Sequence, residues 1–155
     1  MSERIWIFTL SKTLSDEQLQ KLSFFAKEFV QGWTAHEQKL SASFELYQNT
    51  MLIFKVDEQV YDASGCSIDK LTRLIKQMEQ EFSVELLNRL VVAYEDAGVA
   101  KVVHSSKIKE LLENKIITKD TLVFDNTISN SSQFANWKKP LKDTWLSKYL
   151  PIHSS

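Results

Sequence analysis

The sequence is poor in cysteine and glycine and has no long apolar run. Its 155 residues include one cysteine, Cys66, and three glycines. A single cysteine excludes an intramolecular disulfide and a zinc site built from several cysteines, and it fits a reducing compartment, so we expect a cytoplasmic protein. No apolar run approaches the roughly 20 residues of a membrane helix, and residues 5–8 are too short for a signal-peptide core. We therefore expect a soluble protein that does not enter a membrane.

The sequence also lacks a strong charge of either sign. Its formal net charge is -1, and hydrophobic and charged residues make up 43% and 25% of the chain, as in ordinary globular proteins. Residues 1–95 carry 10 basic against 14 acidic side chains, and residues 96–155 carry 9 against 6, so the two parts have charges of -4 and +3. The imbalance is mild and no dense basic stripe is present. Nucleic acid is therefore not expected as a partner.

Strand and helix patterns alternate over residues 1–95. The β-branched and aromatic run 4–9 predicts a strand with both faces at least partly covered. Ser15 precedes Gln18 by three residues, a capping-box pattern, and a helix with one apolar face follows to about Gly32. Apolar and polar residues alternate over 40–47, and the turn residues Gln48 and Asn49 lead into a second strand over 51–56. A helix over 68–82 and a strand over 90–94 follow.

This order of elements is that of a ferredoxin-like fold, with an antiparallel sheet and two helices on one face. We therefore predict an α+β protein with such a domain over residues 1–95. Residues 96–155 are expected to form a smaller subdomain with a turn at 96–98, strands over 99–104 and 121–124, and a short helix around Ile108 between them. The strand 90–94 can belong to either part.

Strand directions predict that two loops lie at the same edge of this sheet. If the first strand runs up, the loop 32–39 after the first helix and the loop 57–67 after the third strand both emerge at the bottom. A ligand-binding rim is expected there. Its candidate binding residues are Trp33, Asp57, Ser64, Gly65, Ser67 and Asp69.

Cys66 and His36 are candidate catalytic residues at this rim. A cysteine just before a helix meets the positive end of the helix dipole, which favours the thiolate, and a nearby histidine could act as its base. The alternative is a small cysteine packed under the loop. Ser67 and Asp69 have the simpler interpretation of a helix cap and a dipole-stabilising carboxylate. His36, Asp57, Asp62 and Cys66 do not form a recognised metal motif, so we expect no metal.

Tryptophan residues pose a similar choice between core and surface. Trp33 lies on the apolar face of the first helix and is either a core residue or a stacking platform. Trp137 and Trp145 stand among four lysines, so they could form a face for a peptide or other partner. The simpler interpretation, which we favour, is that they fasten the end of the chain to its body while the lysines stay solvated.

Three short stretches resemble an uncharacterised bacterial family often labelled "ABC transporter ATPase". They are Trp33-Thr34-Ala35-His36, Asp57-Glu58 with residues 64–69, and residues 121–126; Glu37 stands where that family is expected to have glycine. An ATPase of this class requires a Walker A loop, in which glycine precedes lysine. The backbone N–H groups of the loop and the lysine ammonium then surround the phosphate. The three glycines of this chain precede Trp33, Cys66 and Val99. An ABC-type ATPase is therefore excluded.

The C-terminal part is also similar to small GYF-like modules. The matching stretch runs over residues 108–126, with Asn114-Lys115-Ile116 at the glycine turn of the pattern and Trp137 afterward. GYF relatives bind proline-rich peptides through aromatic surfaces, so this resemblance implies a strand-helix-strand fold with a partner-binding face. The aromatic signature of the peptide-binding type is missing.

Two functions are therefore carried forward from the sequence. The first is a binding or interaction protein without chemistry or cofactor of its own, whose small ligand or protein partner meets the rim of loops 32–39 and 57–67. The alternative is an enzyme that uses Cys66 as nucleophile and His36 as base. A third possibility is a module centred on the C-terminal segment with Trp137 and Trp145, which would form a homo-oligomer or dock a peptide.

Overall fold

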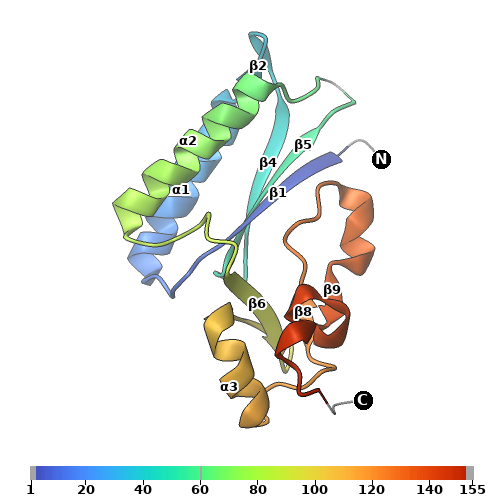
Figure 1. The fold of residues 1–155 in the computed structure, drawn as a ribbon. Helices are drawn as coiled ribbons and strands as arrows, with labels where there is room; N and C mark the ends of the chain where they lie inside the picture. The colour runs from blue at the N-terminus through green and yellow to red at the C-terminus, as the bar shows by residue number, and fades with distance from the viewer. Residues whose placement is uncertain (1–2, 60, 153–155) are drawn as a thin grey trace.

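The protein is an α+β structure in which two antiparallel sheets pack against each other (Figure 1). The computed structural model describes residues 3–59 and 61–152. Its elements are β1 Glu3–Thr9, α1 Asp16–Gly32, β2 Thr34–Ala35, β3 Gln38–Lys39, β4 Ser41–Tyr47, β5 Met51–Asp57, α2 Gly65–Phe82, β6 Val91–Asp96, β7 Val99–His104, α3 Ile108–Glu113, β8 Leu122–Phe124 and β9 Lys138–Pro140. Short 3-10 turns lie at Ser105–Lys107, Ser131–Asn136, Leu141–Asp143 and Trp145–Tyr149.

The first sheet has the strand order β1-β5-β4, and both pairs are antiparallel. Successive side chains of a strand point to opposite faces. Leu52, Phe54 and Val56 accordingly pack in the core cluster that α1 and α2 cover. Met51 and Ile53 belong to a second cluster on the other face. Because both faces of the central strand are apolar, the sheet needs a cover on each side.

Helices α1 and α2 cover the first face together, as Figure 1 shows. The predicted capping box at the start of α1 is confirmed. The Gln18 backbone N–H donates to Ser15 Oγ at 3.1 Å, and the Ser15 backbone N–H donates to Gln18 Oε1 at 3.0 Å. Leu22 and Ala26 of α1 and Ile75 of α2 are fully buried, which fixes the side of each helix that faces the sheet.

The second sheet has the order β7-β6-β8-β9, and it contains the strand that was expected to complete the first. Both edges of β6 are paired, with β7 on one side and β8 on the other, so β6 has no free edge for β1. The ferredoxin-like prediction expected residues 90–94 as the fourth strand of the first sheet, whereas β6 lies in the second sheet. Beside β1 lies the 129–130 segment instead: the Ile5 N–H donates to Ser129 O at 2.9 Å, and Arg4 forms a bridge with Asn130.

Trp137 lies between the two sheets and fastens them together. Its side chain is 7% exposed, and its ring lies edge-on to Tyr47 and Phe124, with centroid distances of 5.0 and 4.9 Å. Its indole N–H donates to Asn126 Oδ1 at 3.0 Å. The prediction of a partner face was therefore wrong for Trp137, because the ring is enclosed by the body of the protein. Trp145 is 47% exposed.

A third core cluster lies on the outer face of the second sheet. Val92 and Tyr94 of β6 pack there with Ile108 of α3 and with Leu141 and Leu146. Ala93, between them, points to the cluster shared by the two sheets. The sequence of layers is therefore helices, first sheet, second sheet, and a thin layer of α3 and 3-10 turns.

The two sheets are also joined through the turn between β4 and β5. The Gln48 side chain accepts the Ala100 N–H of β7 at 2.6 Å and donates to Gly98 O at 3.3 Å. Its amide thus occupies part of the outer edge of β7 in the manner of a peptide group. Within the described ranges, no helix is long and apolar enough to cross a bilayer.

Replacement of Trp137 by Ala is expected to lower the free energy of unfolding by about 3–5 kcal/mol, because it removes a buried indole that contacts both sheets. Trp145→Ala is the matched control, and its cost should stay below about 1 kcal/mol because the ring is half exposed. Urea unfolding followed by circular dichroism measures both. Equal losses would show that Trp137 does not fasten the sheets.

Candidate functional site

The loops 32–39 and 57–67 meet at one end of the first sheet, as their strand directions predict. Together they border a hollow of about 260 Å³. The described residues that line it are Ala35, His36, Gln38, Tyr61, Asp62, Ala63 and Ser64. In Figure 1 this rim lies at the end of the molecule marked by β2 and the start of α2, away from β6 and α3. The hollow is therefore separate from the contact between the two sheets.

The first wall of the hollow is a small hairpin made of β2 and β3, which the sequence patterns did not reveal. Ala35 pairs with Gln38, and His36 and Glu37 form the turn with φ angles of 51° and 66°. Such two-residue turns require positive φ at both central positions and favour Asn-Gly or Gly-Gly. The turn closes with residues that do not prefer this conformation, and it presents His36 to the hollow.

Trp33 supports this hairpin from below. Its side chain is 1% exposed, and its Nε1–H donates to Ser67 O at 2.8 Å, which ties the end of α1 to the first turn of α2. Lys70 Nζ donates to Thr34 Oγ1 at 3.1 Å and makes a second link between α2 and the hairpin. Trp33 is thus a core residue that positions the rim, and a ligand at the surface would not touch its ring.

The second wall begins at the capping box of α2. Ser64 is the N-cap: the Ser67 N–H donates to Ser64 Oγ at 3.2 Å, and the Ser64 N–H donates to Ser67 Oγ at 2.7 Å. The expectation that Ser67 caps the helix was therefore wrong, because the pattern of a serine three residues before a polar residue begins at Ser64. Ser67 is fully buried. Because these two N–H groups serve the cap, they do not form an open nest for an anion.

Two acidic side chains hold the loop that leads to α2. Asp57 Oδ1 accepts the Gln59 N–H at 2.9 Å, and Glu58 Oε2 accepts the Ala63 N–H at 2.8 Å. Both carboxylates replace backbone partners that the irregular loop cannot provide. Asp57 was predicted to bind a ligand, but its carboxylate accepts from the neighbouring Gln59 N–H and it does not line the hollow.

Cys66 and His36 do not come together at the hollow. Cys66 is the second residue of α2 and is exposed, so the alternative of a cysteine packed under the loop was wrong. His36 lines the hollow, but Cys66 does not, and no hydrogen bond joins the two side chains in the described ranges. Gly65 and Asp69 are exposed as well, outside the lining.

The hollow instead gathers three polar side chains from the two loops. Tyr61, Asp62 and His36 are exposed and line it, and none of the three has a hydrogen-bond or ion-pair partner among residues 3–59 and 61–152. Tyr61 was missed in the sequence, and Asp62 was considered only for a metal. A tyrosine and an aspartate one after the other in a polar loop gave no periodic signal to identify them. The described residues contain no group of three metal-ligating side chains.

A larger hollow of about 410 Å³ lies near the other end of α2, and several of its polar side chains already hold backbone groups. Glu79 Oε2 accepts the N–H groups of Leu86 and Leu87 at 2.8 and 3.0 Å. His104 Nδ1 accepts the Ser106 N–H at 3.1 Å. These contacts hold the loop after α2 and the turn after β7, so this hollow has a structural role.

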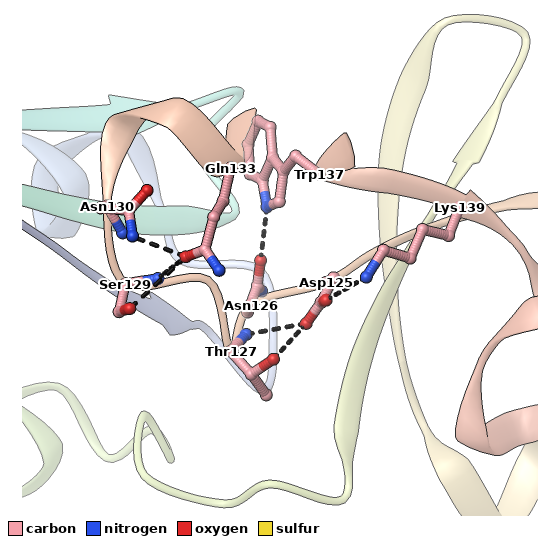
Figure 2. A network of polar contacts seen from close by, with 8 residues as sticks. All are labelled: Asp125, Asn126, Thr127, Ser129, Asn130, Gln133, Trp137 and Lys139. Atoms are coloured by element: carbon pink, nitrogen blue, oxygen red, sulfur yellow. Dashed lines mark hydrogen bonds and ion pairs between the residues drawn. The ribbon is translucent and has the colours of Figure 1, made fainter. Parts of the chain in front are cut away.

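A second polar cluster follows β8 and joins the C-terminal segment to the first sheet (Figure 2). Asn126 accepts from Trp137 and donates to Thr9 Oγ1 at 2.6 Å, so it links both sheets. Gln133 Oε1 accepts the N–H groups of Ser129 and Asn130 at 2.6 and 3.2 Å. Dashed lines in Figure 2 join Trp137 to Asn126 and join Ser129 and Asn130 to Gln133, so these polar groups bond within the protein and form a structural joint.

Asp125 in this cluster has a perturbed acidity. Burial raises its pKa, but hydrogen bonds from Lys139 and Thr127, together with the charge of Lys139, outweigh burial and leave the pKa below its ordinary value of 3.8. Lys139 Nζ lies 2.7 Å from Asp125 Oδ2, and both side chains are partly solvated. The pair contributes modestly to stability.

We expect Glu37→Gly to stabilise the protein by about 1 kcal/mol, because glycine adopts positive φ without the steric cost of a side chain. Glu37→Ala removes the same charge but keeps the strain, so it is the matched control and should give no gain. Thermal unfolding of the three proteins measures the difference. A gain in the alanine variant alone would contradict backbone strain at this turn.

Asp125→Asn should lower the free energy of unfolding at pH 7 by up to about 1 kcal/mol, because it removes the ion pair with Lys139. A carboxylate whose pKa is lowered on folding contributes stability above its unfolded pKa of about 3.9 and loses it as the pH falls through the folded value. The difference between variant and wild type should therefore shrink as the pH falls through the lowered folded pKa and disappear once Asp125 is protonated in both the folded and the unfolded protein. Denaturant unfolding at several pH values measures it, with exposed Asp143→Asn as control; a difference that persists in acid would contradict the assignment.

The comparisons with known proteins add no family to this geometry. No protein-family model, curated protein or solved structure matches the chain.

Proposed function

We propose that this protein is a non-catalytic binding protein whose ligand or partner enters the hollow between the loops 32–39 and 57–67. The observation that supports this most is the convergence of His36, Tyr61 and Asp62, from two loops distant in sequence, with polar atoms that have no partner in the described ranges. Elsewhere the carboxylates of Asp57, Glu58 and Glu79 are used to hold backbone N–H groups. Ligand sites are concave and use a small number of placed polar groups to orient the ligand, which these three side chains could supply.

The support beneath these side chains also favours a binding role. Buried Trp33 and the capping box of α2 lie under the two walls, so the backbone on each side is held by defined hydrogen bonds. A site supported in this way loses less conformational freedom when a ligand binds. The positive φ angles of His36 and Glu37 add a constraint of the kind that clusters at functional sites.

The thiol-dependent enzyme is the second candidate, and the exposure of Cys66 favours it. The second residue of a helix lies at the positive end of the dipole, where a thiolate is stabilised. No base is hydrogen-bonded to Cys66 among the described residues, which weighs against it. The rate of alkylation of Cys66 against pH distinguishes the two: rapid reaction well below about pH 8.5, where a free cysteine ionises, would favour the enzyme.

The two parts of the chain can each be related to a known fold pattern. We interpret the elements from β1 to α2 as a ferredoxin-like pattern that lacks its fourth strand in the first sheet, which the order β1-β5-β4 supports. We interpret β6 to β8, with α3 between them, as the strand-helix-strand unit of a GYF-like subdomain that includes the strand 90–94. Under this interpretation, exposed Trp145 is the remaining aromatic residue for a partner at that end.

Fragment screening by NMR on the isotopically labelled protein tests the proposed site. Bound fragments should shift the backbone signals of residues 35–38 and 61–64 together, and Tyr61→Ala should weaken this binding about tenfold, since an aromatic anchor contributes roughly 1–2 kcal/mol. Phe24→Ala is the matched control, because Phe24 is an exposed aromatic residue on α1 outside the hollow. Shifts confined to the surroundings of Trp145 would reject the rim and favour the C-terminal end.

A further inference from the structure

The rim around the hollow is acidic. Residues 33–39 and 57–70 contain five carboxylates, Glu37, Asp57, Glu58, Asp62 and Asp69, against two lysines, Lys39 and Lys70. Lys70 is already bonded to Thr34 beneath the hairpin. A surface with this excess of negative charge attracts cations and repels anions.

The lining of the hollow has the same preference at shorter range. Its described residues include the carboxylate of Asp62 and no lysine or arginine. Tyr61 adds an aromatic ring that is 42% exposed, and the face of such a ring attracts an ammonium or guanidinium group. The imidazole ring of His36 has a nitrogen that can accept a hydrogen bond. A carboxylate, an aromatic face and an imidazole acceptor together suit an organic cation.

Three N–H groups beside the hollow already have acceptors within the chain. Those of Ser64 and Ser67 donate within the capping box, and that of Ala63 donates to Glu58. An anion would therefore meet Asp62 without compensating donors from these residues. The volume of about 260 Å³ also lies below the roughly 300–1,000 Å³ of pockets for drug-sized ligands, so a single alkyl chain with its charged head is a suitable occupant.

We propose that the hollow binds an alkylammonium group, with Asp62 as its counter-ion and the Tyr61 ring against its alkyl and ammonium portions. This inference rests on the proposed binding function and names the class of ligand. The same chemistry occurs in a free polyamine and in a lysine side chain of a protein partner.

Three probes of equal length test the charge preference: n-butylammonium, n-butanol and butyrate, each titrated into the labelled protein and followed by NMR. The ammonium should shift the signals of residues 61–64 and 35–38, and its dissociation constant should be at least about fivefold lower than that of the alcohol. Butyrate should not bind there. Asp62→Asn should weaken ammonium binding about tenfold, in line with the loss of a charged hydrogen bond. Asp69→Asn removes the same charge from an exposed position outside the lining and should change it less than about twofold.

The outcomes separate this inference from the proposed function. Butyrate or butanol binding in the hollow without the ammonium would overturn the cation inference and leave the binding site standing. If Asp62→Asn and Asp69→Asn weaken ammonium binding equally, the attraction comes from the overall negative charge of the rim. That result would overturn Asp62 as the counter-ion. If none of the three probes binds at the hollow, the cation inference is overturned. Whether the hollow binds any ligand is then decided by the fragment screen. Spermidine and a terminally blocked Gly-Lys-Gly peptide then distinguish a polyamine from a lysine-bearing partner.

Discussion

The structure depends on the fact that β5 is apolar on both faces. Residues 51–54 are all buried, so alternate side chains of the same strand must be removed from water on opposite sides of one sheet. Helices α1 and α2 cover one side, and the second sheet with Trp137 covers the other. Because burial of apolar area is the main favourable term in folding, the C-terminal part completes the core of the N-terminal part.

The position of the rim follows from the strand directions in the first sheet. Once β1 and β4 are both antiparallel to β5, the segments before β4 and after β5 must emerge at one end of the sheet. The second sheet covers the other face and leaves this end uncovered (Figure 1). The hollow is thus a consequence of strand direction, and its chemistry is set by a few loop residues.

Patterns in the sequence were sufficient where a local rule decides the structure. The capping box of Ser15 and Gln18, the alternation over 40–47 and the turn at Gln48 and Asn49 all predict elements that are present. The meeting of the two loops also followed from strand order alone. These features depend on backbone hydrogen bonds and on periodic burial, which short stretches encode.

Features that depend on distant partners were not accessible in this way. The run 90–94 reads as a buried strand in either sheet, and only its pairing with β7 and β8 decides between them. The surroundings of Trp137 come from Tyr47 and Phe124, far away in the sequence, so its spacing among lysines gave no sign of burial. Tyr61 and Asp62 lie in an irregular loop, where no period marks which side chain faces inward.

The contact of Gln48 with β7 has a consequence for association. An end strand offers unpaired backbone groups to other chains, and natural proteins block such edges to avoid aggregation. Here a side-chain amide from the neighbouring sheet occupies Gly98 O and the Ala100 N–H, at the end where a new strand would begin to pair. The turn that closes one sheet therefore occupies the first part of the edge of the other, so a longer turn that moved Gln48 away would expose these two backbone groups to pairing with another chain.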